Sequence, residues 1–76
     1  MNPNELLRIP EVIRTIGLKR SAIYARVSDG RMPAPVHIGT AALWPADEIA
    51  EWVRYIRENR CEPPAGFYPQ HDEGRA

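Results

Sequence analysis

Apolar residues recur three or four positions apart in three stretches of the chain, which places them on one side of a helix. The three sets are Val12, Ile13 and Ile16; Ile23 and Val27; and Ile49, Trp52, Val53 and Ile56. This spacing predicts helices over about residues 10–16, 19–29 and 46–59. The second helix is short of apolar positions, so its other side must face solvent or a partner.

Residues typical of helix ends mark the boundaries of the first two helices. Pro10 suits a first helical turn, because the N–H that it lacks would have no helical acceptor there. Gly17 ends the first helix, and Asp29–Gly30 ends the second. Ser21 is the predicted N-cap of the second helix. An earlier start would place the cation of Lys19 against the positive end of the helix dipole, which is unfavourable.

Between the second and third helices the pattern changes to that of two short strands. Residues 36–38 alternate apolar and polar side chains, residues 39–41 predict a turn, and residues 42–44 predict a returning strand that ends at Pro45. A hairpin this short is not stable alone, so it must pack on the helices, with Trp44 as its anchor. The order of elements predicts a mainly α fold with a small β-hairpin, a winged helix-turn-helix.

The length of the chain bounds its organisation. Its 76 residues are enough for one small domain, which we expect over residues 1–60. Residues 61–76 are rich in Pro and Gly without periodicity, which predicts a mostly disordered tail. The alternative is that Phe67 and Tyr68 dock back on the domain or bind a partner. The single cysteine, Cys61, excludes an internal disulfide, and we expect a soluble cytoplasmic protein without a signal peptide or membrane span.

Charge is distributed unevenly along the chain, although the formal net charge is zero. Between residues 8 and 31 there are six cations and two acids, whereas residues 47–51 hold three acids and no base. The basic excess coincides with the second helix, LKRSAIYARVSDG over residues 18–30. A helix with one apolar edge and one edge of cations and hydroxyls can enter a DNA major groove. The plain alternative is an amphipathic helix with solvated charges.

No pattern of catalytic or metal-binding residues is visible. His37, His71 and Cys61 are too dispersed for a metal site, and no Cys-x-x-Cys spacing occurs. The sequence contains neither a Gly-rich phosphate loop nor a nucleophile paired with a base. We therefore expect a protein that is not an enzyme and that holds no cofactor or metal.

Several short motifs occur in a characteristic order. They are LRIPEV (residues 7–12), GL (17–18), RSxIY (20–24), DGRxPxPV (29–36), IG (38–39) and Trp44. In this order and spacing the chain resembles the AlpA family of small prophage-encoded transcriptional regulators, which are similar to phage excisionases and to the DNA-binding part of MerR-type proteins. The resemblance implies a winged helix-turn-helix of the excisionase type, with residues 19–29 as recognition helix in the major groove.

The predicted wing departs from the family pattern at its tip. The family usually has an arginine or another polar donor after the wing glycine, whereas here Gly39 is followed by Thr40, Ala41 and Ala42. The wing is therefore expected to contact phosphate through backbone N–H groups and Thr40 at most. The second helix and Arg31 would then supply most of the contact with DNA.

Seven residues are candidate DNA contacts: Lys19, Arg20, Ser21, Tyr24, Arg26, Arg31 and Thr40. Arg20 is the candidate for base contact, because a guanidinium can donate two hydrogen bonds to guanine O6 and N7. Ser21 either caps the helix or contacts phosphate, and Tyr24 either donates to phosphate or packs on the first helix. The other cations are candidate phosphate contacts, which position a protein without reading sequence. Solvated charge is the alternative, and it is strongest for Arg26, whose helical angle differs from that of Arg20.

The functional hypothesis is a sequence-specific DNA-binding transcriptional regulator, associated with the nucleoid, that controls integrase or excision genes. A second reading is an excisionase-type architectural factor that bends attachment-site DNA, because both functions use the same fold. A third, from another class, is a protein-interaction module without DNA binding. The expected partner is double-stranded DNA, and homodimerisation or side-by-side binding on repeats would lengthen the site.

Overall fold

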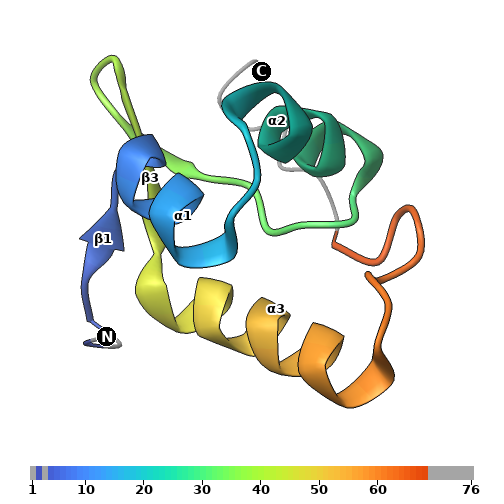
Figure 1. The fold of residues 1–76 in the computed structure, drawn as a ribbon. Helices are drawn as coiled ribbons and strands as arrows, with labels where there is room; N and C mark the ends of the chain where they lie inside the picture. Colours follow the sequence, from blue (N-terminus) through green and yellow to red (C-terminus); the bar gives the residue numbers. More distant parts are fainter. Residues whose placement is uncertain (1, 3, 69–76) are drawn as a thin grey trace.

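Three helices and a three-stranded antiparallel sheet make up the part of the chain that the computed structural model describes, residues 2 and 4–68. In chain order the elements are β1 (Leu6–Leu7), α1 (Ile9–Ile16), α2 (Arg20–Asp29), β2 (Val36–Ile38), β3 (Ala41–Pro45) and α3 (Ala46–Asn59) (Figure 1). The prediction of a mainly α fold with a small β-hairpin is confirmed. The arrangement is compatible with a winged helix-turn-helix.

Helix α1 begins one residue before the predicted start and ends where the sequence predicts. The carboxylate of Glu11 accepts a hydrogen bond of 2.9 Å from the backbone N–H of Arg8, so one free donor at the helix start is satisfied. At the other end Gly17 adopts φ 77°, and its N–H donates to the carbonyl of Ile13. This left-handed turn, which favours glycine, directs the chain into α2.

Helix α2 starts one residue after the predicted residue 19, but its N-cap differs from the prediction. The helix begins at Arg20 with Lys19 in the N-cap position, and no side chain caps it. The prediction of Ser21 as N-cap is wrong, because Ser21 lies inside the first turn. A 3.0 Å hydrogen bond from the N–H of Ile23 to the carbonyl of Lys19 closes this first turn. Half-buried Leu18 packs against the core just before it.

Strand β3 is the centre of the sheet, with β2 on one side and β1 on the other. In the wing, the hairpin β2–β3, His37 lies opposite Ala42, and a turn at residues 39–40 joins the strands. This confirms the predicted hairpin, although its turn is one residue shorter than predicted and β3 runs from Ala41 through Pro45 instead of over residues 42–44. The pairing of Leu7 with Trp44 was not predicted, and the N–H of Ala46 donates to the carbonyl of Glu5 at 2.8 Å. The N-terminal segment therefore holds the base of the wing.

Helix α3 starts directly after the wing and runs to Asn59, as predicted. Asp47 and Glu48 lie in its first turn, where carboxylates are favoured by the helix dipole. Its apolar side buries Ile49 and Trp52. Among the described residues, no helix combines the length and the apolar character needed to cross a membrane.

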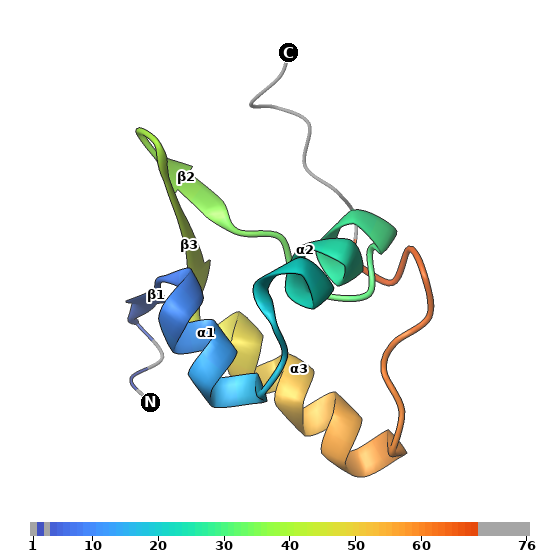
Figure 2. The ribbon, with the colours of Figure 1, turned by 45° about the horizontal axis from the view of Figure 1, so that its top comes forward.

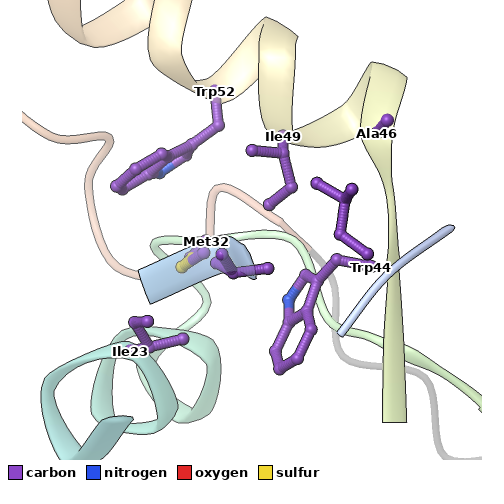
Figure 3. Close-up of a cluster of buried hydrophobic side chains, with 8 residues drawn as sticks. Ile23, Met32, Trp44, Ala46, Ile49 and Trp52 are labelled. Carbon is purple, nitrogen blue, oxygen red and sulfur yellow. The ribbon is translucent and has the colours of Figure 1, made fainter. Parts of the chain in front are cut away.

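One apolar core joins β1, β3 and the three helices, whereas the side chains of β2 are exposed. The side chains labelled in Figure 3 converge between α2, α3 and β3. The buried apolar residues are Leu7, Val12, Ile23, Met32, Trp44, Ala46, Ile49 and Trp52. Trp44 is fully buried, as expected of an anchor. Met32 was not predicted in the core, because it lies in the irregular connector of residues 31–35. Its unbranched thioether can fill an irregular gap between helices.

Two buried indoles hold this connector. The Nε1–H of Trp52 donates to the carbonyl of Arg31 at 2.8 Å, and the Nε1–H of Trp44 donates to the carbonyl of Pro33 at 2.9 Å. Both carbonyls belong to a segment without regular structure, so the indoles supply partners that no strand or helix offers. The connector joins α2 to β2, and these bonds therefore fix the position of α2 relative to the wing.

The chain returns to α2 after α3, as residues 61–68, here called the C-terminal segment (Figure 2). The N–H of Gly66 donates to the carbonyl of Asp29, and that of Tyr68 donates to the carbonyl of Gly30 at 2.8 Å. Pro63 is buried, and Tyr68 packs against the core. These contacts match the alternative in which the aromatic residues dock back on the domain. Residues 69–76 lie outside the described residues.

Candidate nucleic acid interface

Five residues of α2 are exposed along one side of the helix. They are Arg20, Ser21, Tyr24, Ala25 and Ser28, here called the outer face. Their spacing of one, three and four residues places them within one half of the helical circumference. Ile23, on the opposite side, is fully buried. The outer face contains no carboxylate, and the one exposed carboxylate of α2, Asp29, is the last residue of the helix.

Two cations stand at the amino end of this face. Lys19 and Arg20 are exposed, and no carboxylate of the described residues forms an ion pair with either. The first backbone N–H groups of α2 also lack a side-chain cap. Cations near a helix start are disfavoured by the dipole, by about 0.3–1 kcal/mol each. A bound anion would remove this penalty and satisfy the free donors, so the amino end of α2 suits a phosphate group.

Tyr24 joins the outer face to the wing. Its ring lies edge-on to the indole of Trp44, with ring centroids 5.7 Å apart and planes at 62°. Such a pair contributes about 0.5–1.5 kcal/mol beyond the area that it buries. The side chain is still 39% exposed, and its hydroxyl has no hydrogen-bond partner among the described residues. The ring is thus structural, while the hydroxyl remains free for a ligand.

Arg26 lies on the other side of α2. Its Nε is 2.9 Å from Oε1 of Glu62, and its Nη1 donates to the carbonyl of Ala22. Six residues after Arg20, a helix has turned by about 240° beyond one full turn, which explains why the two guanidinium groups diverge. The structure does not bring Arg26 together with the outer face.

Arg31 also contacts the C-terminal segment. Its Nη1 donates to the carbonyl of Pro63 at 3.3 Å, and its Nε lies 3.9 Å from Oδ2 of Asp29. The side chain is half-buried at the carboxyl end of α2, whereas Lys19 and Arg20 lie at the amino end. Among the predicted contacts, the structure gathers Lys19, Arg20, Ser21 and Tyr24 at the first turns of α2 and separates Arg26 and Arg31 from them.

The wing projects from the body of the molecule and carries Thr40 at its tip (Figure 2). No lysine or arginine occurs between residues 36 and 45. The exposed side chains of β2 are instead His37 and two apolar residues, Val36 at 44% and Ile38 at 60% exposure. Contact of this wing with DNA would therefore rest on Thr40, backbone N–H groups and apolar surface.

Sequence reasoning missed the residues that hold the outer face in place. Glu62 and Pro63 lie in the segment predicted to be disordered, yet they contact Arg26 and Arg31. Helical periodicity carries no signal for such contacts, because they join residues more than thirty positions apart. Within the described residues, no group of three or more His, Cys, Asp or Glu side chains is placed to hold a metal ion.

Comparison with known proteins independently supports the family resemblance that the short motifs indicate. Residues 5–58, more than half of the chain, match the family described as Prophage CP4-57 regulatory protein (AlpA). The chain is also similar to the uncharacterized protein ORF88 of Enterobacteria phage P4, with 38% identity over 48 residues. That match covers 62% of this chain and 54% of the phage protein, so it spans about half the length of this relative. No solved structure gives a significant match.

The family match and the fold agree with the resemblance that the short motifs indicate. The matched range includes all three helices but for one residue of α3, together with the wing, and it stops before the C-terminal segment. The chain belongs to the AlpA family of prophage regulatory proteins.

Proposed function

We propose that the protein is a sequence-specific DNA-binding transcriptional regulator that places α2 in the major groove and controls prophage integrase or excision genes. The observation that supports this most directly is the outer face of α2, which is exposed and free of carboxylates. It includes Arg20 and is preceded by Lys19, and neither cation forms an ion pair among the described residues. A helix of this chemistry matches the width and the acceptor groups of the major groove.

Within this proposal the exposed residues at the start of α2 have distinct roles. Arg20 contacts a base edge, with guanine O6 and N7 as its acceptors. Lys19 and the uncapped backbone N–H groups bind phosphate, and the hydroxyl of Ser21 assists. The free hydroxyl of Tyr24 donates to a second phosphate while its ring stays on Trp44.

The remaining candidates act mainly around this centre. Arg31 and Thr40 contact phosphates at the edges of the site. Arg26 supports the helix from behind, because its guanidinium is bound to Glu62 and to the helix backbone. The binding energy is therefore concentrated in the first two turns of α2.

The first test compares Arg20→Ala with Arg54→Ala, which removes the same charge from the exposed side of α3. We expect Arg20→Ala to weaken binding to the native promoter region by about 1–3 kcal/mol and to relax base preference. Lys19→Ala should weaken binding to specific and to random DNA equally. It should also lower the magnitude of the slope of log affinity against log salt by about 0.9. Gel shifts and binding-site selection measure both effects.

Equal binding by Arg20→Ala and Arg54→Ala would contradict the assignment of α2. Absence of salt-sensitive binding to any DNA at low salt would contradict DNA binding altogether. DNA bending, measured with the same complexes by circular permutation of the site, separates a regulator that leaves DNA straight from an architectural excision factor.

A further inference from the structure

An apolar groove lies where the end of α1, the turn before α2 and the last turns of α3 meet. Its volume is about 410 Å³. The apolar side chains that line it are Ile16, Leu18, Trp52, Val53 and Ile56. Arg26 and its ion-pair partner Glu62 also line the groove, so the groove lies behind α2 and away from the outer face. DNA bound at the outer face would leave this groove open.

A second hollow, of about 520 Å³, adjoins the groove on α3. It is lined by Arg54, Arg57, Arg60 and Glu58, and Arg57 lines both spaces. None of these three arginines forms an ion pair within the described residues. Three guanidinium groups and one carboxylate leave an excess of positive charge beside an apolar floor.

We propose that the groove and the arginine hollow together form a docking surface for an acidic segment of a partner protein. One or two apolar side chains of that segment would fill the groove, and the neighbouring carboxylates would bind the guanidinium groups. Arginine pairs with carboxylates through two parallel hydrogen bonds, which gives such a contact geometric specificity.

The same observations disfavour nucleic acid as the occupant. A phosphate backbone has no apolar side chain to place against Trp52, Val53 and Ile56, so the groove would stay empty or hydrated. An amphipathic acidic peptide satisfies both parts of the surface, in the manner of a helix in a groove. This docking surface is additional to the proposed DNA contact, and it would let one molecule hold DNA and a protein partner at once.

The experiment uses the full chain and a synthetic glutamate-rich peptide with two leucines one helical turn apart. A peptide with lysine in place of every glutamate is its matched control. Backbone amide chemical shifts locate the bound peptide, and titration of the fluorescence of Trp52 and Trp44 measures affinity. We expect shifts around the groove with the acidic peptide, and much weaker ones with the lysine peptide.

Two substitutions at exposed positions test the surface without disturbing the core. Thr15→Phe places a ring over the rim of the groove, and Arg57→Ala removes the cation shared by the two spaces. Each substitution should weaken binding of the acidic peptide by about tenfold. Arg20→Ala should bind the peptide like the wild type, and Arg57→Ala should keep wild-type affinity for DNA.

Several outcomes would overturn the proposal. In these outcomes the acidic peptide shows no binding, the lysine peptide binds equally well, or the chemical shift changes are confined to the outer face. Wild-type affinity for the acidic peptide in both Thr15→Phe and Arg57→Ala would have the same consequence. Concentration-dependent shifts without peptide that disappear in Thr15→Phe would assign the groove to a second copy of the chain instead. Loss of DNA binding in Arg20→Ala alone leaves this result unaffected, so the two proposals fail separately.

Discussion

Two glycines with nearly the same backbone conformation have different surroundings. Gly17 and Gly30 end α1 and α2 with φ values of 77° and 75°. A Cβ at Gly17 would meet nothing within 4 Å. A Cβ at Gly30 would lie 2.8 Å from the backbone N and Cα of Gly66 and 3.0 Å from the carbonyl oxygen of Tyr68. Conformational strain is common to both positions, whereas close approach is specific to Gly30.

We therefore predict unequal effects of the same substitution. Gly17→Ala should lower the free energy of unfolding by about 1 kcal/mol, the usual penalty of a side chain in the left-handed region. Gly30→Ala should lower it by at least about 2 kcal/mol, because the backbone of the C-terminal segment must also move. Chemical denaturation of the two variants measures the difference. Equal losses would show that the C-terminal segment does not press on Gly30 in solution.

Tyr68 links the stability of the fold to pH. Burial raises the pKa of its phenol, and the negative charges of Glu51 and Glu48 and the nearby Tyr55 raise it further. Above its ordinary pKa of about 10, the unfolded chain therefore loses this proton while the folded chain still holds it. The unfolded state then binds fewer protons, so stability falls as pH rises through this range.

The corresponding prediction compares the wild type with Tyr68→Phe. Between about pH 9 and pH 11, the free energy of unfolding should fall more steeply in the wild type than in the variant. Below that range the two curves should run parallel, because the phenol is protonated in both states. Urea denaturation across the series measures this. Parallel curves at every pH would exclude the effect of Tyr68.

At the scale of the elements, α2 and the wing share the proposed interface unequally. The first turns of α2 offer two unpaired cations, whereas the exposed wing offers Thr40 and apolar side chains. Helical periodicity correctly predicted that Arg20, Ser21 and Tyr24 are exposed, because burial of Ile23 determines which side faces solvent. It did not predict the N-cap of α2, because that cap depends on how Leu18 packs.

Because the wing tip has no cation, adding one there is predicted to increase the affinity for DNA. Thr40→Arg adds a cation at the wing tip, where the chain is exposed. We expect tighter binding to both specific and random DNA, and a salt slope steeper by about 0.9, because one more counterion is released. Ala50→Arg adds the same charge to the exposed side of α3 and is the control. An equal gain in the two variants would mean that the wing does not approach DNA.

At the scale of the whole molecule, the C-terminal segment completes the domain. Its backbone bonds to Asp29 and Gly30, the burial of Pro63 and the packing of Tyr68 all fix the carboxyl end of α2. A domain of this size has a small core and gains much from each added contact. The segment therefore contributes to the stability of the proposed interface, although it lies behind the outer face.

Removal of residues 61–76 should lower the free energy of unfolding by about 2–4 kcal/mol, through lost apolar burial and lost hydrogen bonds. Glu62→Gln in the full chain is the matched comparison. It removes only the ion pair with Arg26, whose side chains are 31% and 37% exposed, so a loss below about 1 kcal/mol is expected. Thermal or urea denaturation measures both. An unchanged midpoint in the truncated chain would show that α2 is held by the core alone.

Local sequence determined the helices and the hairpin of this protein. Apolar spacing, the glycines at helix ends and the alternation of residues 36–38 each act over a few residues, so they can be read directly from the chain. The same reasoning identified Arg20, Ser21 and Tyr24 as neighbours on one helical face, which the structure shows as exposed. It also supplied the family resemblance.

Tertiary structure alone decided which groups from distant segments meet. Segments distant in sequence meet in the pairing of β1 with β3, in the indole bonds to the connector and in the contact of Arg26 with Glu62. The groove behind α2 is likewise lined by residues from distant segments. Such contacts depend on how the elements are placed around the core, and no local pattern encodes that placement. For this reason the exposed face of α2 could be predicted from the sequence, whereas the contacts of Arg26 and Arg31 with the C-terminal segment could not.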